Sequence, residues 1–293
     1  SETTGISRVI DTYMILFRKA ADVSAYLMKQ KITGKDIGFV PTMGALHPGH
    51  ISLINASKKR DTLTVGSIFV NPAQFNNPDD FDNYPSTLEK DIDVLEKAGC
   101  DVLFLPSVSE MYPHGTANAE TYDLGYLETV LEGKYRPGHF QGVCLVVNRL
   151  LDIIPADRLY LGQKDYQQCM VIKKLTELKA IKTTIIICPT LREKDGLAMS
   201  SRNLRLTEKD RKQALKISEA LLIIRNGLQP GNLESLKQKA TLHLTGAGFR
   251  VDYVEIARAD SLDIIDHWDG KQKTVALAAA FLGDVRLIDN MLL

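Results

Sequence analysis

Short apolar runs rich in β-forming residues alternate with amphipathic stretches along the first two thirds of the chain, and this rhythm restricts the possible folds most. The apolar runs lie at residues 38–42, 64–70, 101–105, 158–161 and 183–188. Residues 86–98 and 165–178, each between two such runs, have the apolar spacing of a helix that packs on one face. A repeated succession of strand, helix and strand predicts an α/β fold with a parallel sheet covered by helices on both faces.

The rhythm changes after about residue 189, which predicts a boundary between two domains. The capping box Thr207-Glu208-Lys209-Asp210 predicts the start of a long helix, glycine and proline at 227–231 end it, and a second helix follows. Strands are then expected at residues 251–256, 274–281 and 285–288. We therefore predict a Rossmann-like, doubly wound parallel sheet in residues 1–189 and a smaller α+β domain in residues 190–293.

Composition argues against several kinds of partner. Lys and Arg (36) balance Asp and Glu (36), so the chain lacks the basic excess by which proteins hold nucleic acid. No apolar run approaches the roughly 20 residues of a membrane span, and the N-terminus has no basic segment followed by an apolar one. The four cysteines form no C-x-x-C pair and have no histidine at zinc-ligand spacing, which favours free thiols. We expect a cytoplasmic protein with no nucleic-acid or membrane partner.

Polar clusters follow four of the predicted strands. They occupy residues 43–50, 71–75, 162–168 and 189–193. In an open parallel sheet, ligands bind beyond the carboxyl ends of the strands, so all four clusters are expected at one edge. We predict the functional site there.

The first cluster contains two histidines in a pattern that favours an anion. Gly44 and Gly49 have the spacing of a phosphate loop, but His50 stands where that loop needs lysine. Pro48 suits the first turn of a helix, and Gly49 lets a ligand approach the backbone closely. His47 and His50 are then expected near a helix N-terminus, where free N–H groups and the dipole favour phosphate. A pair of structural histidines and a metal-binding pair remain alternatives.

A second loop, Met199-Ser200-Ser201-Arg202-Asn203, makes nucleotide binding the better interpretation. His47-Pro48-Gly49-His50 resembles the HxGH signature of the nucleotidylyltransferase and class I aminoacyl-tRNA synthetase superfamily. The 199–202 segment resembles the Lys-Met-Ser-Lys-Ser loop of that superfamily. More closely, residues 41–47, 69–75, 136–140, 162–168 and 195–203 are similar to the pantothenate synthetases, and the similarity reaches Arg286-Leu287-Ile288-Asp289-Asn290.

The resemblance implies a homodimeric ligase that uses ATP and Mg²⁺ to activate pantoate as an adenylate and then joins it to β-alanine. ATP would lie across the strand ends, and the smaller domain would form a lid over it. His50 would act on the α-phosphate as electrophile and proton donor, and His47 would hold the β and γ phosphates. The implied ATP-binding residues are Met43, Gly44, Ala45, Leu46, His47, Pro48, Gly49, His50, Gly162, Gln163, Lys164, Asp165, Leu191, Met199, Ser200, Ser201 and Arg202.

Charged and hydroxyl side chains complete the implied phosphate site. Lys164 would supply a fixed positive charge, and Asp165 would bind the ribose hydroxyls. Ser200, Ser201 and Arg202 would reach the β and γ phosphates from a loop that closes. A surface ion pair and a plain surface turn are the corresponding structural alternatives.

Neutral amides are the implied ligands of the substrate acid. Gln74 and Gln168 would bind pantoate, because an amide both donates and accepts without neutralising the nucleophilic carboxylate. Asn71 and Tyr84 are further candidates in this pantoate and β-alanine site. Asp91 would assist Mg²⁺, although some relatives carry two adjacent acids where this chain has one. The remaining candidates, Arg136, His139, His243 and His267, are interpreted as structural.

The sequence offers no protein nucleophile for this chemistry. It contains no G-x-S-x-G elbow and no positioned Cys–His pair, which fits direct attack of a carboxylate on ATP. One rival is a nucleotidylyltransferase acting on a phosphate-bearing acceptor, which would want Arg or Lys where this chain has Gln74 and Gln168. Another rival is an RNA-binding or tRNA-charging protein, against which the balanced charge argues.

Overall fold

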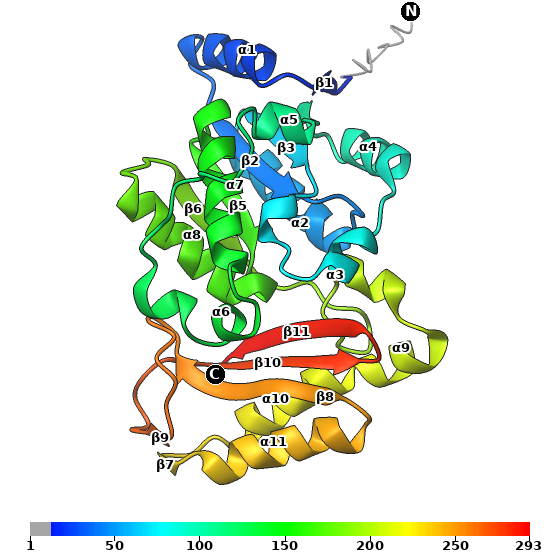
Figure 1. Ribbon diagram of the computed structural model, residues 1–293, viewed down its shortest axis with the longest axis vertical. Helices are drawn as coiled ribbons and strands as arrows, with labels where there is room; N and C mark the ends of the chain where they lie inside the picture. Colours follow the sequence, from blue (N-terminus) through cyan, green and yellow to red (C-terminus); the bar gives the residue numbers. More distant parts are fainter. Residues whose placement is uncertain (1–12) are drawn as a thin grey trace, which may run out of the picture.

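A computed structural model describes residues 13–293 (Figure 1). The first 12 residues, which belong to the expected 1–189 domain and to the expectation about a leader segment, lie outside the described residues. Within residues 13–293, no helix is long and apolar enough to cross a membrane.

Six parallel strands form the main sheet, in the order β1-β4-β3-β2-β5-β6. The strands are β1 (Ile15–Phe17), β2 (Ile37–Thr42), β3 (Leu63–Ile68), β4 (Val102–Phe104), β5 (Arg158–Gly162) and β6 (Thr184–Cys188). The five predicted strands and the α/β class are confirmed. The edge strand β1 is an addition to them, because its three partly exposed residues are too few to show a period.

Helices cover both faces of this sheet because alternate strand residues are apolar on each side. Phe39 packs into the core beneath α1, α7 and α8, whereas its neighbour Val40 packs into the core beneath α2 and α4. The helices of this lobe are α1 (Ala20–Ile32), α2 (Pro48–Arg60), α3 (Pro78–Asp82), α4 (Leu88–Lys97), α5 (Val108–Met111), α6 (Glu132–Tyr135), α7 (His139–Ile153) and α8 (Tyr166–Leu178). We call β1 to β6 with these helices the parallel-sheet lobe.

The C-terminal lobe is an antiparallel sheet, in the order β11-β10-β8, with α10 and α11 on one face. Its elements are α9 (Glu208–Ala214), α10 (Lys216–Gly227), α11 (Glu234–Gly246), β8 (Arg250–Arg258), β10 (Thr274–Leu282) and β11 (Val285–Leu292), with the short pair β7 (Gly231–Asn232) and β9 (His267–Trp268). Thr207 caps α9 as predicted, accepting a hydrogen bond from the Asp210 N–H. The expected long helix is instead two helices, α9 and α10, which meet at Leu215.

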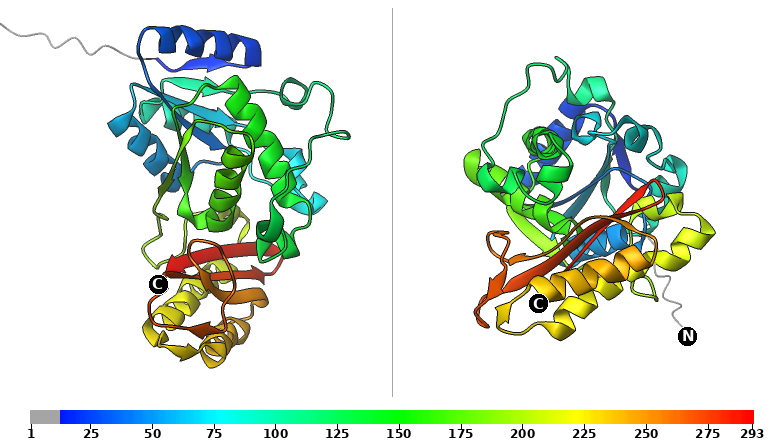
Figure 2. Two further views of the ribbon diagram at one scale, coloured as in Figure 1. Left: turned by 90° about the vertical axis from the view of Figure 1, so that its left-hand side faces the viewer. Right: turned by 60° about the horizontal axis from the view of Figure 1, so that its bottom comes forward.

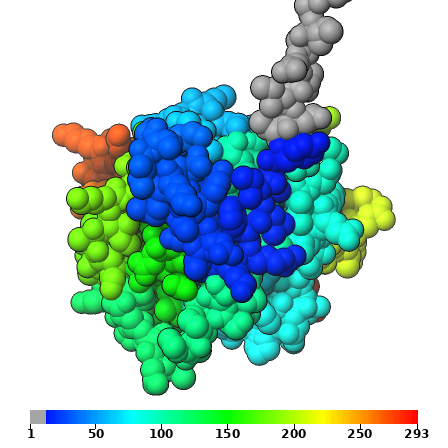
Figure 3. Space-filling model, turned by 90° about the horizontal axis from the view of Figure 1, so that it is seen from above, coloured from blue at the N-terminus to red at the C-terminus, as the bar shows by residue number. Residues whose placement is uncertain are grey.

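The second face of the antiparallel sheet packs against the parallel-sheet lobe. Tyr253 and Leu277 share a buried cluster with Leu131 and with Tyr166 of α8. Both views in Figure 2 show this sheet between the parallel-sheet lobe and helices α10 and α11. Seen from the opposite end of the molecule (Figure 3), α1 forms a large part of the surface. The junction of the two lobes therefore includes a packed apolar cluster.

Candidate active site

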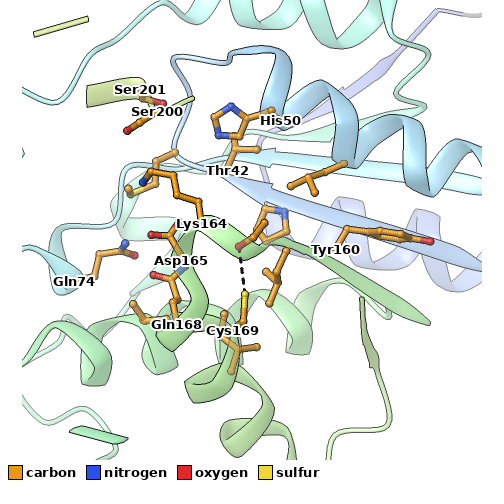
Figure 4. Close-up of a pocket in the computed structure, with 18 of the residues that line it drawn as sticks. Thr42, His50, Gln74, Tyr160, Lys164, Asp165, Gln168, Cys169, Ser200 and Ser201 are labelled. Atoms are coloured by element: carbon orange, nitrogen blue, oxygen red, sulfur yellow. Dashed lines mark hydrogen bonds between the residues drawn. The ribbon is translucent and has the colours of Figure 1, made fainter. Parts of the chain in front are cut away.

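A cavity of about 230 Å³ lies at the carboxyl edge of the parallel sheet. The chain reverses its direction of winding between β2 and β5, which are neighbours in the sheet, and such a switch point is where open α/β sheets bind ligands. The predicted residues that line the cavity are Met43, His47, Gly49, His50, Asn71, Gln74, Tyr84, Gly162, Lys164, Asp165, Gln168, Leu191, Met199, Ser200, Ser201 and Arg202. Gly44, Ala45, Leu46, Pro48, Gln163 and Asp91 do not line it. Figure 4 shows Lys164 between His50 and Gln168.

The two histidines of the first cluster lie at the start of α2, and both rings accept backbone N–H groups there. The His50 Nδ1 accepts the backbone N–H of His47 at 3.1 Å, and the His47 Nδ1 accepts the N–H of Gly49 at 3.1 Å. A neutral imidazole with an accepting Nδ1 carries its proton on Nε2. Each ring therefore keeps an Nε2–H donor for a ligand, while the first free amides of the helix are partly satisfied by the rings.

Both rings are held neutral at physiological pH. Burial, followed by the charge of Lys164, lowers the pKa of His50 from 6.5 to about 4. Burial, followed by the neighbouring His50 and by Lys164, lowers the pKa of His47 to about 3. The ring centroids are 4.0 Å apart, so charging both would be costly. The pair can donate hydrogen bonds to phosphate oxygens without carrying charge before the ligand arrives.

The turn before His47 is held by Asp91. Its carboxylate accepts the backbone N–H of Ala45 at 2.8 Å and of Leu46 at 2.9 Å, and the hydroxyl of Thr87 at 3.0 Å. Ala45 has a left-handed backbone, φ 50°, which costs a non-glycine residue about 1 kcal/mol. Asp91 is 2% exposed and faces this turn, away from the cavity. In this geometry Asp91 stabilises the turn, and its expected part in binding Mg²⁺ stays a prediction.

The second loop is held by a hydrogen bond of its own and by an ion pair with Asp80. The Ser200 hydroxyl caps the turn that follows by accepting the N–H of Arg202 at 3.2 Å. The Arg202 guanidinium donates from Nε and Nη2 to the carboxylate of Asp80, at 3.0 and 2.7 Å. Arg205 donates to the same carboxylate at 3.0 Å. The Nε and Nη2 edge of the Arg202 guanidinium is thus already paired with Asp80. Nη1 makes neither of these bonds and is the group that can donate to phosphate.

Lys164 and Asp165 lie on a single 3-10 turn, Gln163–Asp165, directly after β5. The preceding Gln163 points elsewhere: its Nε2 donates to the Oδ1 of Asn290 in β11, at 3.3 Å. The family resemblance implies that Gln163 binds ATP, whereas in the structure its side chain contacts the C-terminal lobe.

A hydrogen-bonded group fixes the amide end of the cavity. Asn71 is buried, and its Nδ2 donates to the Oε1 of Gln74 at 3.0 Å and to the carbonyl of Gly142 at 3.1 Å. Tyr112 donates to the Asn71 Oδ1 at 2.6 Å. With its oxygen occupied, Gln74 presents its NH₂ donors to a ligand. An added Cβ on Gly142 would lie 2.0 Å from the carbonyl oxygen of Ala73, so only glycine lets α7 approach this turn.

Arg136 and His139 line the cavity, although their sequence context favours a structural role. His139 is 4% exposed, with its Nδ1 2.7 Å from the carbonyl of Gln74 and its Nε2 3.4 Å from Nη1 of Arg136. Burial, followed by the charge of Arg136, lowers the pKa of His139 to about 3. A neutral ring that donates from Nδ1 and accepts at Nε2 satisfies both contacts. The signal that could have identified them is their place in the Arg136-Pro137-Gly138-His139-Phe140 block.

Protein metal ligands do not cluster in the described part of the chain. Residues 13–293 contain no group of three or more His, Cys, Asp or Glu side chains that could hold an ion. The metal-pair alternative for His47 and His50 is not favoured either, because both Nδ1 atoms accept backbone N–H groups.

The chain is similar to known proteins over nearly its whole length. The family profile described as Pantoate-beta-alanine ligase matches residues 15–292. A pantothenate synthetase of Cytophaga hutchinsonii is 43% identical over 283 residues, 96% of this chain and 99% of the relative. A pantothenate synthetase of Acetivibrio thermocellus is 44% identical over 289 residues, 97% of this chain and 99% of the relative.

Solved structures of related proteins have the same fold as this chain. Pantothenate synthetase from Thermus thermophilus superposes with a TM-score of 0.87 at 37% identity, covering 95% of this chain and 99% of that one. The pantoate-beta-alanine ligase from Francisella tularensis, complexed with beta-gamma ATP and beta-alanine, has a TM-score of 0.80 at 41% identity, covering 95% and 97%. With the fold, the two signature loops and the family profile in agreement over nearly its whole length, the chain belongs to the pantoate-beta-alanine ligase family.

Proposed function

We propose that this chain condenses pantoate with β-alanine, using ATP and passing through a pantoyl adenylate. The observation that carries the proposal is the two-ended cavity. One end has uncharged imidazole donors, Lys164 and the Ser200–Arg202 loop, and the other has the neutral amides of Gln74 and Gln168. The family and the ATP and β-alanine named for the Francisella relative support the same substrates.

At the phosphate end, the residues would stabilise charge as it moves onto pyrophosphate. His50 would donate its Nε2–H to the α-phosphate, and His47 would bind the β and γ phosphates. Lys164 would give a fixed charge, and Ser200, Ser201 and Arg202 would complete the site. Preorganised donors in a closed pocket are worth more than the same donors in water, because they need no reorganisation during the reaction.

At the amide end, Gln74 would orient pantoate with its NH₂ group. Asn71 would act through Gln74, since its own amide is fully engaged. Gln168 lines the same end of the cavity and would bind a pantoate hydroxyl or carboxylate. Tyr84 also lines the cavity, and with its ring beside Arg202 it would lie between the amide end and the phosphate end.

The chemistry then needs two displacements. A carboxylate oxygen of pantoate attacks the α-phosphorus, and pyrophosphate leaves. The amine of β-alanine attacks the acyl carbon, the adenylate C–O bond breaks, and AMP leaves. Cys169 lines the cavity, but burial raises its pKa to about 12, so it stays a thiol and is unsuited to covalent catalysis.

Mg²⁺ would enter with ATP. The phosphate oxygens and water would supply its ligands, since Asp91 is committed to the Ala45 turn. Its chemistry would be to neutralise phosphate charge.

Three further expectations accompany the proposal. Residues 190–293 would act as a lid domain over residues 1–189, and the free cysteines fit a reducing cytoplasm. The chain would form a homodimer, mainly through the parallel-sheet lobe. We predict a dimer of roughly twice the 32.6 kDa chain mass in sedimentation at micromolar concentration, and a monomer would contradict it.

A substrate panel tests the function. Pyrophosphate release should require both ATP and pantoate, and amide formation should require β-alanine. Release with a phosphate-bearing acceptor in place of pantoate would favour a nucleotidylyltransferase, and release driven by an amino acid with tRNA would favour a tRNA-charging enzyme.

A further inference from the structure

Strand β11 carries three polar residues, Arg286, Asp289 and Asn290, that have no part in the proposed reaction scheme. Arg286 and Asn290 contact the parallel-sheet lobe. Arg286 donates to both carboxylate oxygens of Glu132 in α6, at 2.5 and 2.8 Å, and to Asp252 at 2.9 Å. Burial tends to raise the pKa of Glu132, but the hydrogen bonds and charge of Arg286 outweigh it and lower this pKa to about 2. The strand is therefore docked on the parallel-sheet lobe by a charged, buried contact.

Asn290 touches the turn that presents Lys164. It is 2% exposed, and its Nδ2 donates to the carbonyls of Gln163 and Lys164, both at 2.9 Å. Its Oδ1 accepts the Gln163 Nε2–H at 3.3 Å. Only an uncharged amide offers two N–H donors and an acceptor in this space. All three of these hydrogen bonds of the Asn290 side chain go to the 163–165 turn.

The residue before Asn290, Asp289, helps to hold the second loop in place. Asp289 accepts two hydrogen bonds from Arg192, at 2.6 and 2.9 Å. Arg192 also donates to the carbonyls of Gly196 and Asn290, at 3.0 and 3.2 Å. Since Arg192 bridges to Ala198, this contact lies at the base of the loop that leads into Met199 and Ser200.

We infer that Asp289 and Asn290 are positioning residues for the adenylation step: this two-residue segment sets Lys164 and the Ser200–Arg202 loop in register with each other. Neither residue lines the cavity of the candidate active site. Asp289 acts through Arg192 on the second loop, and Asn290 acts through the backbone of the 163–165 turn on Lys164. The inference rests on the proposed function where it is tested by the rate of adenylate formation. Where it is tested by ATP affinity, it requires only that the chain binds ATP.

A double-mutant cycle tests it on the full chain. The variants are Asn290→Ala, Lys164→Ala and the double substitution, each checked for folding by circular dichroism. Asn290→Ala should slow single-turnover adenylate formation roughly 10-fold or more, because misplacing a catalytic charge costs rate. In the Lys164→Ala background the same change should cost less than about 2-fold, because the group that it positions is gone. Equal fold losses in both backgrounds would overturn the inference.

The same cycle is measured on ATP affinity by calorimetry without pantoate. Coupling between positions 290 and 164 should appear there too, and its absence would count against the inference. A wild-type protein that binds ATP but forms no adenylate would refute the proposed function, while the calorimetric cycle would still decide the positioning role.

Two further variants separate positioning from general destabilisation. Leu282→Ala removes a buried apolar side chain from the same lobe, away from the cavity. It should lower thermal stability but leave adenylate formation within about 2-fold of wild type. A rate loss equal to that of Asn290→Ala would show that any weakening of the C-terminal lobe slows adenylate formation, which would overturn the inference. Asn290→Ser, which keeps one donor, serves if the alanine variant does not fold, and an intermediate rate is expected.

Discussion

The hydroxyl of Ser201 donates a hydrogen bond to the carbonyl oxygen of Ala45 at 3.0 Å. The same residue, Ala45, gives its N–H to Asp91. A single peptide segment in a left-handed conformation therefore joins the second loop to helix α4 and leads into His47. The two signature loops are thus linked by a hydrogen bond without any nucleotide. The link runs through Ala45, whose left-handed backbone is strained.

Asp91→Asn should lower turnover roughly 10-fold, with the fold retained. The asparagine amide would place an N–H₂ group against one of the backbone N–H groups of Ala45 and Leu46, which loosens the turn. Ala45→Gly should restore part of the loss, because glycine adopts φ 50° without strain. Steady-state kinetics of both single variants and the pair provide the measurement.

Asp93→Asn on the same helix is the matched control, since Asp93 makes an exposed pair with Lys97. It should leave turnover unchanged. If Asp91→Asn instead raised the Mg²⁺ concentration needed for half-maximal rate, with no rescue by Ala45→Gly, a metal role for Asp91 would be supported.

Stability should fall as the pH is lowered from about 6.5 toward 4. His47, His50 and His139 have pKa values of about 3, 4 and 3 in the folded chain, below the usual 6.5. The unfolded chain binds these protons near pH 6.5 and the folded chain does not, so unfolding takes up protons within this window. Each histidine should contribute a slope of about 1.4 kcal/mol per pH unit near pH 5.

Urea unfolding between pH 7.5 and 5 measures this slope. His139→Gln should make it shallower by about one histidine's contribution. A free energy of unfolding that is flat across this range would show that the three rings are protonated normally. Glu132, with a pKa of about 2, adds acid sensitivity only below about pH 4.5.

Replacing His50 with alanine should lower turnover by roughly 10²-fold or more while leaving the fold intact. The missing Nε2–H would remove a donor from the transition state, and the loss of Nδ1 would leave the His47 N–H without its partner. His50→Gln, which offers an amide donor, is expected to have a turnover between those of the wild type and the alanine variant. A folded alanine variant with wild-type turnover would return His50 to a purely structural role.

The alternation of apolar runs with amphipathic stretches is enough to predict the parallel sheet and its ligand edge, because strands buried on both faces are apolar at neighbouring positions such as Phe39 and Val40. Local patterns cannot predict which polar residues face the cavity. Gln163 stands in the right segment, yet its side chain turns to Asn290 across the lobe boundary. Asn71 does line the cavity, but its amide is bonded to Gln74. Asp91 likewise meets Ala45 only through tertiary packing.

The structural interpretation of Arg136 and His139 is incomplete for the same reason. A histidine at the start of α7 can serve as a buried structural group and as a cavity wall together, and only the three-dimensional packing reveals both. The break between α9 and α10 is also invisible in the sequence, since nothing at Leu215 opposes a continuous helix by propensity.

The order of the chemistry follows from the side chains that line the cavity. Cys169 is held as a thiol and the side chains of Gln74 and Gln168 are neutral, so pantoate should attack ATP directly. The first half-reaction should then run without the amine. With Mg²⁺, ATP and pantoate alone, the enzyme should catalyse pantoate-dependent exchange of labelled pyrophosphate into ATP. When β-alanine is added, the adenylate is cleaved at its acyl C–O bond, so oxygen labelled in the pantoate carboxylate should appear in AMP. Unlabelled AMP would exclude the acyl adenylate, whereas exchange in the absence of pantoate would require a nucleotide bound covalently to the enzyme.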